Sequence, residues 1–228
     1  KGMGLEDDVL AEHQPRIPRP DIVDRNGVVI ATDIAVASLY ADPRKIIDVE
    51  EAVESLTATV PDLDAKALRA KLTQPGRAFA WLKRQVAPEE RDAVYNLGIP
   101  GVGFVNERRR VYPLGRLAAH TVGYVDLDSK GIAGIEKYLD DQGAIYTASL
   151  AEGSGETASP AQISADTRVQ HALTDELEKA VTKFNAIAAG GIVIDITTGE
   201  IIALVSLPDF NPNQEDKKFR KEQANMMT

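Results

Sequence analysis

The stretch from Arg19 to Thr32 constrains the fold most, because it predicts a tight β-hairpin close to the start of the chain. Its centre, Asn26-Gly27, is a strong signal for a turn with positive φ at both central residues. Ile22 alternates with charged neighbours before the turn, and the β-branched run at 28–30 leads out of it. We therefore expect an antiparallel strand pair here.

Three charged residues crowd this predicted turn, namely Arg19, Asp24 and Arg25. A hairpin tip needs only the Asn-Gly pair, so the charges require a separate explanation. They are either a solvated surface group or partners of charges elsewhere in the chain.

The composition fits a folded protein of one large or two small domains, with 228 residues of which 43% are hydrophobic and 27% charged. The net charge of −9 argues against a nucleic-acid binder, which needs a basic face. No apolar run approaches the length of a membrane span, although the abrupt start at Lys1 is compatible with an anchor or signal upstream. The absence of cysteine excludes disulfides and thiolate metal sites.

The first two thirds of the chain mix strands with short helices. Helices are expected after the capping residues Asp48 and Asp64 and after Pro88, with Gly98 near the end of the third. Further strands are expected at 36–41, 79–86 and 102–112, and short helices at 117–122 and 134–139. The fold class is therefore α+β.

A second unit is expected after a linker at 147–160 that is rich in Ser, Ala, Gly, Glu and Thr. Asp166 caps a predicted helix with one apolar stripe, and two apolar strands at 192–196 and 201–205 form a hairpin after it. Continuous apolar strands need cover on both faces, and this helix covers one. The hairpin is therefore expected to be a site of self-association.

The usual constellations of catalytic and metal-binding residues are missing. The three histidines lack metal spacing, and the stretch 126–137 fails as a calcium loop because Lys130 and Lys137 occupy ligand positions. Gly101-Val102-Gly103 lacks the third glycine of a dinucleotide fingerprint. The run at 108–110 is either a phosphate binder or, more commonly, a solvated strand end or a salt-bridge donor. No cofactor and no metal are expected.

Three segments taken together resemble the motifs of a known family. They are Arg19-Pro20-Asp21-Ile22-Val23-Asp24-Arg25-Asn26-Gly27, Arg110-Val111-Tyr112-Pro113-Leu114-Gly115, and Gly131-Ile132-Ala133-Gly134-Ile135-Glu136-Lys137. In this order and spacing they resemble the N-terminal module of class B penicillin-binding proteins, the monofunctional peptidoglycan transpeptidases. The resemblance extends from about residue 19 to 228 and favours the cell-division branch.

The resemblance implies a penicillin-binding-protein dimerisation (pedestal) domain, followed by an incomplete transpeptidase fragment of one helix and a β-hairpin. The implied boundaries are an extended lead-in at 1–18, the pedestal at 19–146, the linker, and the start of the transpeptidase domain at 161–228. In the family the three motifs meet in space. The structural residues that this implies are Arg19, Asp24, Arg25, Asn26, Gly27, Arg110, Tyr112, Pro113, Gly115, Gly131, Gly134 and Glu136.

Five of these residues are charged and would form one network, because buried arginines need carboxylate partners. They are Arg19, Asp24, Arg25, Arg110 and Glu136.

The catalytic motifs of the family, Ser-x-x-Lys, Ser-x-Asn and Lys-Thr-Gly, do not occur in these 228 residues. The resemblance therefore implies the non-catalytic front of a penicillin-sensitive D,D-transpeptidase of septal cell-wall synthesis, with its membrane anchor absent. This part would act as a scaffold and docking module at the periplasmic face of the inner membrane. The implied partners are its own catalytic domain and cell-division membrane proteins, including a polytopic glycosyltransferase.

Two alternatives remain open at this point. The chain could be a stand-alone periplasmic binding or adaptor protein that reuses the module, which a gene ending near Thr228 would favour. It could also be an enzyme with an acid-based site of its own, which requires converging acids in a pocket. A Ser-x-x-Lys motif encoded shortly downstream would decide between the first reading and these two.

Overall fold

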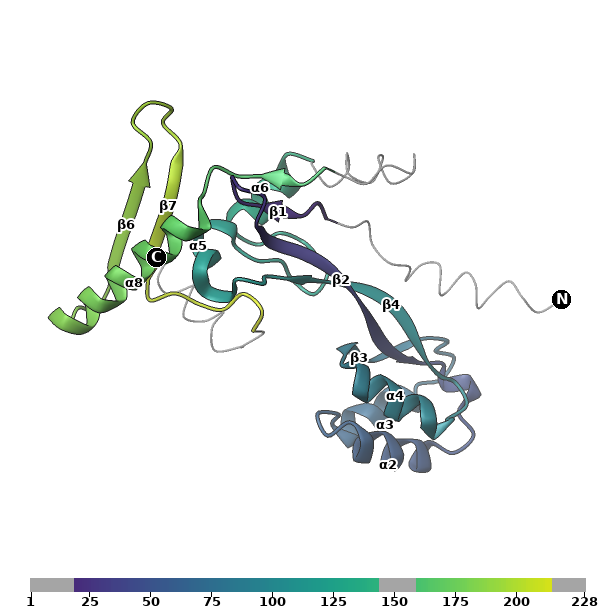
Figure 1. Cartoon of the computed structure of the whole chain (residues 1–228). Coiled ribbons are helices and arrows are strands. Elements are labelled where there is room, and N and C mark those ends of the chain that lie inside the picture. Colours follow the sequence, from purple (N-terminus) through teal and green to yellow (C-terminus); the bar gives the residue numbers. More distant parts are fainter. Residues whose placement is uncertain (1–18, 144–158, 215–228) are drawn as a thin grey trace. The chain divides into compact units, whose positions relative to one another are not determined.

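The computed structural model describes residues 19–143 and 159–214 (Figure 1). The expected lead-in at 1–18, most of the expected linker and the tail at 215–228 lie outside the described residues. No helix in the described ranges is long and apolar enough to cross a membrane.

The described residues form two compact units. Residues 35–109 make up one, here called the head unit, while residues 19–34 and the described residues from 110 onward belong to the other, the base unit. The head is an insertion between residues 34 and 110, and the flanking segments fold with the C-terminal part of the chain.

The head unit begins and ends in strands that both units share, β2 (Val29–Ala41) and β4 (Val102–Val111), and it adds β3 (Ala80–Val86). Both β3 and β4 pair with β2. Between them lie the short η1 (Pro43–Lys45) and the helices α2 (Val49–Thr59), α3 (Ala65–Leu72) and α4 (Pro88–Leu97).

The predicted helix ends of the head are confirmed. Asp48 accepts the backbone N–H groups of Glu50 and Glu51 at the start of α2, and Asp64 caps α3 in the same manner. Pro88 opens α4, and Gly98 ends it in the left-handed conformation. These signals are local, which is why the sequence reveals them.

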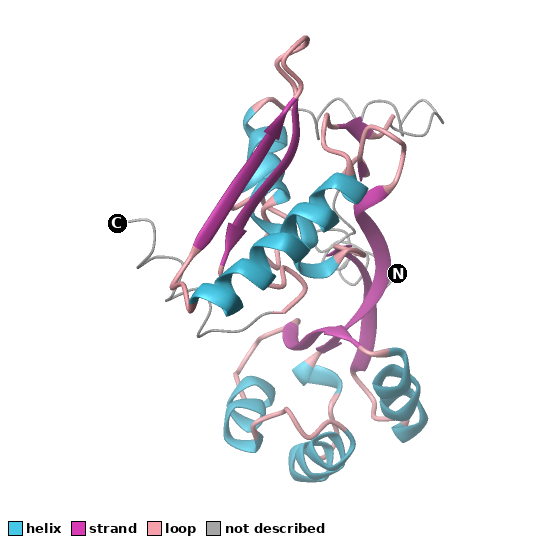
Figure 2. Cartoon of the chain, turned by 60° about the vertical axis from the view of Figure 1, so that its left-hand side comes forward, coloured by secondary structure: helices cyan, strands magenta, loops and turns pink. Residues whose placement is uncertain are grey.

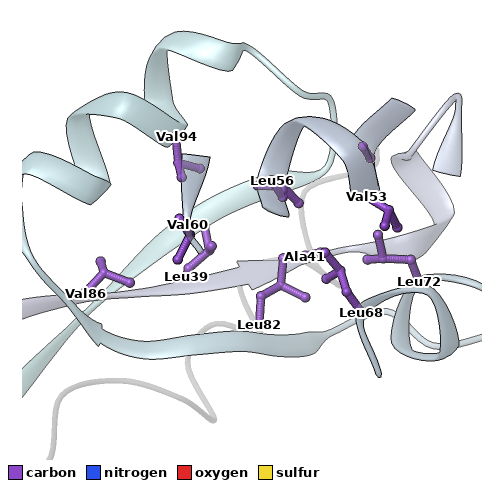
Figure 3. Close-up of a cluster of buried hydrophobic side chains, with 11 residues drawn as sticks. Leu39, Ala41, Val53, Leu56, Val60, Leu68, Leu72, Leu82, Val86 and Val94 are labelled. Atoms are coloured by element: carbon purple, nitrogen blue, oxygen red, sulfur yellow. The ribbon is translucent and has the colours of Figure 1, made fainter. Parts of the chain in front are cut away.

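The head core lies between the helices and the sheet. Leu39 from β2 and Leu82 from β3 meet Leu56 of α2, Leu68 of α3 and Val94 of α4 (Figure 3). Each element contributes its apolar stripe, so the burial of these aliphatic side chains holds helices and sheet together.

The base unit contains a small sheet in which β1 (Ile22–Val23) pairs with β2 in antiparallel and with β5 (Ala161–Gln162) in parallel. It also contains η2 (Gly115–Ala118), α5 (Ala119–Val122) and α6 (Gly134–Asp141). A core of Ile22, Ile30, Tyr112, Val122 and Leu139 packs these pieces together.

The hairpin at the start of the chain forms, but two of its details differ from expectation. The segments predicted as separate strands at 28–30 and 36–41 belong to the single strand β2. In the turn only Gly27 has a positive φ, of 82°, whereas Asn26 does not. The cause is Asp24, whose carboxylate accepts the backbone N–H groups of Asn26 and Val28 and so closes the turn itself.

The C-terminal part of the base unit consists of α8 (Thr167–Phe184) and an antiparallel hairpin of β6 (Ala189–Ile194) and β7 (Ile201–Leu207) (Figure 2). The leucines of α8 reach one face of this hairpin at Gly191, where an added Cβ would lie 3.0 Å from Leu173. On the opposite face Ile192 is 58% exposed. The predicted one-sided cover is therefore seen in the structure.

Candidate functional site

A buried ion network joins the start of the chain to β4 and α6. Glu136, whose side chain is fully buried, lies at its centre. One carboxylate oxygen accepts from Arg19 Nε at 2.9 Å and the other from Arg110 Nε at 2.7 Å. The side chains of both arginines are almost completely buried as well. Because all three charged groups are out of water, each depends on the others for its charge partner, and removal of one would leave an uncompensated buried charge.

Two further acids complete this group, which we call the Glu136 network: Arg19, Asp33, Arg110, Glu136 and Asp140. Asp33 accepts from Arg110 at 3.1 Å and from the backbone N–H of Arg19 at 2.9 Å. Asp140 accepts from Arg19 Nη1 at 2.6 Å.

Backbone carbonyls accept further hydrogen bonds from both guanidinium groups. Arg19 donates to the carbonyls of Ser129 and Glu136, and Arg110 donates to that of Pro20. The two arginines are therefore held by fixed main-chain groups as well as by carboxylates.

The glycines of the third motif make the close approach around Glu136 possible. A Cβ on Gly131 would lie 2.4 Å from the carbonyl oxygen of Glu136. Gly134 has a φ of 62°, and its Cβ would lie 2.6 Å from the backbone nitrogen of Gly123. Both positions therefore require glycine for space, and the second requires it for conformation also.

The electrostatics of the network follow from its burial. Burial alone would lower the pKa of Arg110, but the charges and hydrogen bonds of Glu136 and Asp33 outweigh it and raise this pKa. Burial, followed by the nearby Glu136 carboxylate, raises the pKa of Tyr112 well above its usual value. Both groups therefore stay protonated, and neither is suited to proton transfer near neutral pH.

Asp24 and Arg25 do not belong to the Glu136 network, which corrects the expectation of one five-residue group. Asp24 is buried elsewhere and accepts from the backbone N–H of Thr167 at 3.1 Å and from its hydroxyl at 2.9 Å. Arg25 forms a half-exposed pair with Glu200 at 3.1 Å. Successive residues of a turn point in different directions, so closeness in sequence did not place them together.

These turn contacts form a second structural site, at the N-terminus of α8. The N-cap Asp166 accepts from the backbone N–H of Arg168, and its side chain is also paired with Asn26. The backbone N–H of Arg25 donates to Ala165 at 3.0 Å. The hairpin turn therefore fixes the first turn of α8 through side-chain and backbone bonds.

The other predicted residues lie around the second motif. Tyr112 is buried, and its hydroxyl accepts from the backbone N–H of Val125 at 3.1 Å. Pro113 lies in a turn closed by the backbone N–H of Gly115, which donates to the carbonyl of Tyr112 at 2.9 Å. Gly115 has a φ of 55°. This turn leads directly from β4 into η2.

Several residues of these sites were not predicted from the sequence. Asp33 is one acid within an apolar strand segment, and Asp140 is one of two adjacent acids, so neither pattern names its partner. Gln170 donates to the carbonyls of Leu117 and Leu204 and accepts from the backbone N–H of Leu204 at 2.9 Å. Gln170 is not one of the apolar residues predicted to line one side of this helix, and its buried amide is satisfied by these bonds.

The Glu136 network connects three segments that lie far apart in the sequence. Within residues 19–143 and 159–214, no three His, Cys, Asp or Glu side chains are grouped so that they could hold a metal ion. The acids and arginines of the Glu136 network are paired with one another. A buried group of mutually paired charges orients the segments that supply it.

The family model of the penicillin-binding protein dimerisation domain matches residues 16–143, more than half of the chain. The chain therefore belongs to this family of penicillin-binding proteins.

Named relatives agree with this assignment. The probable peptidoglycan D,D-transpeptidase FtsI of Caulobacter vibrioides is 40% identical over 91% of this chain and 35% of its own length. The probable peptidoglycan D,D-transpeptidase PenA of Neisseria meningitidis serogroup A is 34% identical over 91% of this chain and 39% of its own length.

Solved structures show the same fold. The penicillin-binding protein PBP2 of Helicobacter pylori superimposes with a TM-score of 0.58 at 19% identity, covering 91% of this chain and 46% of that one. The chain spans between a third and two fifths of the length of the curated relatives described above.

Proposed function

We propose that this chain is the non-catalytic N-terminal part of a peptidoglycan-crosslinking D,D-transpeptidase, and that it acts as a scaffold for the start of the catalytic domain. The observation that carries this proposal is the contact between Asp24 and Thr167. It ties the matched dimerisation segment, 16–143, to the first turn of the long helix α8. The names of the relatives support the reaction class.

The chain itself is proposed to be inactive. Its sequence contains no Ser-x-x-Lys, Ser-x-Asn or Lys-Thr-Gly motif, and these carry the nucleophile and its activation in penicillin-recognising enzymes. The crosslinking activity would belong to the longer protein, for which the relatives provide the model.

We further propose that the chain docks other proteins of the septal cell-wall machinery at the periplasmic face of the inner membrane. The proposed partners are cell-division membrane proteins, among them a polytopic glycosyltransferase. The similarity to FtsI and PenA supports a role in peptidoglycan synthesis, and the division branch is proposed from the three sequence motifs.

The scaffold role is tested by comparing this chain with a fragment that begins at residue 159. Hydrogen exchange should show that the amides of α8 and β7 are protected in the chain and lose most of this protection in the fragment. Equal protection in both would overturn the scaffold role, since α8 and the hairpin would then not need the pedestal.

The docking role is tested by capture of a detergent-solubilised septal glycosyltransferase on the immobilised chain. An elongation-type glycosyltransferase is the matched control. Retention of the septal protein alone supports the proposal, whereas retention of neither or of both equally contradicts it.

A further inference from the structure

The segment after β7 runs across the pedestal residues 112–124 and is fastened to them at three places. We call this segment, Pro208–Asn213, the strap. Its pedestal contacts lie within the matched dimerisation domain, while the strap itself lies outside that match. Strap and pedestal contacts belong to the same compact unit.

Asn213 provides the first anchor, because its side-chain amide bonds both the N–H and the carbonyl of one residue, as the backbone of a neighbouring β-strand would. Its Oδ1 accepts from the backbone N–H of Tyr112 at 2.9 Å, and its Nδ2 donates to the carbonyl of Tyr112 at 2.9 Å. Asn211 orients this amide, because its Oδ1 accepts from both the backbone N–H and the Nδ2 of Asn213. The Tyr112 backbone is thereby held by a residue 101 positions away.

The other two anchors involve charge and aromatic packing. Asp209 is buried against Arg116 in a salt bridge. The ring of Phe210, which is 6% exposed, makes edge-on contacts with His120 and Tyr124 at centroid distances of 5.1 and 5.9 Å. A buried aromatic ring and a charged pair together make the strap a docked element of the fold.

Tyr112 connects the strap to the Glu136 network. It lies two residues after Arg110, whose guanidinium group is bound by Glu136. The ring of Tyr112 packs in the same core as Leu139 of α6, the helix that carries Glu136 and Asp140. A shift of β4 in response to the network therefore moves the backbone to which Asn213 is bonded.

We propose that docking of the strap and closure of the Glu136 network stabilise each other through Tyr112. A disturbance of the network would then loosen the strap, and release of the strap would loosen the network. This coupling is a property of this chain and goes beyond the proposed scaffold role.

Hydrogen exchange at two backbone amides measures the coupling in the intact 228-residue chain. The Tyr112 amide reports the strap because it donates to Asn213, and the Gly131 amide reports the network because it donates to Asp140. Asn213→Ala should accelerate exchange at Tyr112 about tenfold by removing two hydrogen bonds. It should also accelerate exchange at Gly131 about fivefold if the two sites are coupled.

The reverse experiment uses Asp140→Asn, which weakens the partly exposed end of the network. It should accelerate exchange at Gly131 and, by reciprocity of coupled equilibria, also at Tyr112. Gln214→Ala, a change at the exposed neighbour of the strap, is the matched control and should leave both amides unchanged.

Local effects alone would overturn the proposal, namely Asn213→Ala acting on Tyr112 only and Asp140→Asn on Gly131 only. Asn211→Ala removes the acceptor that orients the Asn213 amide but leaves both bonds between Asn213 and Tyr112, so it provides a milder variant if alanine at position 213 prevents folding. This milder variant should accelerate exchange at Tyr112 and at Gly131 less than Asn213→Ala does, and by the same ratio at both amides. Failure of this coupling would leave the capping of α8 by Asp24 intact, so it is distinguishable from failure of the scaffold role.

Discussion

Asp24 accepts two hydrogen bonds from Thr167, although 143 residues separate them in the sequence. Thr167 is the first residue of α8, so a carboxylate from the hairpin turn lies at the positive end of this helix dipole. The same carboxylate also closes its own turn by accepting from Asn26 and Val28. One buried acid therefore links the shape of the hairpin to the position of an 18-residue helix.

Replacing this acid should destabilise the base unit strongly. We expect Asp24→Ala to lower the free energy of unfolding by about 3 kcal/mol, because it removes a charged acceptor and leaves buried donors unpaired. Chemical denaturation followed by circular dichroism measures the loss. Asp141→Ala, at an exposed acid of α6, is the control and should change little. An equal, small effect of both changes would mean that the Asp24 contacts contribute nothing.

The stability of the chain should also depend on the ionisation of Asp24. Burial opposes ionisation, but hydrogen bonds from Val28, Thr167 and Asn26 outweigh it and lower the pKa of Asp24 from 3.8 to about 2. The folded-state pKa is thus below the unfolded one, so this stabilisation is complete above the unfolded pKa and is lost as pH falls from 3.8 towards 2.

Because other acids in the chain also have lowered pKa values, the contribution of Asp24 is isolated by comparison with Asp24→Asn. The measurement is a series of thermal melts between about pH 5 and about pH 2, which is roughly the range in which carboxylates titrate. The midpoint of the native chain should fall more steeply than that of the variant in the acid range. Parallel curves would show that Asp24 ionises alike in both states.

The Glu136 network and the Arg25 pair should differ sharply in energetic weight. Glu136→Ala leaves two buried arginines without their shared partner and should cost about 3–5 kcal/mol. Arg25→Ala is the matched control, because its pair with Glu200 is 37% and 43% exposed and should contribute about 0–1 kcal/mol. Thermal and denaturant unfolding of the two variants side by side would test this. Equal losses of stability would contradict the conclusion that Glu136 is buried and that the Arg25 pair is exposed.

Features that depend on neighbouring residues could be predicted from the sequence. Contacts between residues far apart in the sequence were predicted less well. The caps at Asp48 and Asp64 were predictable because donor and acceptor lie within one helical turn. The meeting of Arg19, Arg110 and Glu136 was implied by family resemblance, whereas physics alone indicated only that the charges needed partners.

The errors also have physical causes. Arg25 was assigned to the wrong group because neighbouring turn residues point in different directions. The bond between Asn213 and the backbone of Tyr112 spans 101 residues and leaves no periodic pattern, so it could not be read from the sequence.

The 228-residue chain should not react with penicillin, because its sequence contains no Ser-x-x-Lys nucleophile. A labelled penicillin followed by a denaturing gel provides the measurement, with an intact class B penicillin-binding protein as the positive control. A covalent band at the mass of this chain that disappears on replacing a serine would contradict the proposed inactivity.

The hairpin of β6 and β7 should make the isolated chain self-associate. At β7, the side-chain amide of Gln170 already occupies backbone groups, since it accepts from the N–H of Leu204 and donates to its carbonyl. At β6 the situation differs, because within the described residues this strand pairs with β7 and with no other strand. On the face away from α8, Ile192 and Ile194 are 58% and 52% exposed. An open strand edge next to an apolar face favours pairing with a second copy.

We expect the mass measured by size-exclusion chromatography with light scattering to rise with concentration for the whole chain. Ile192→Lys should abolish association because it places a charge on the exposed apolar face. Thr198→Lys, in the exposed turn between the strands, is the control and should associate normally. A monomer at high concentration with residues 192–205 protected from hydrogen exchange would contradict the prediction, since the apolar face would then be covered within one chain.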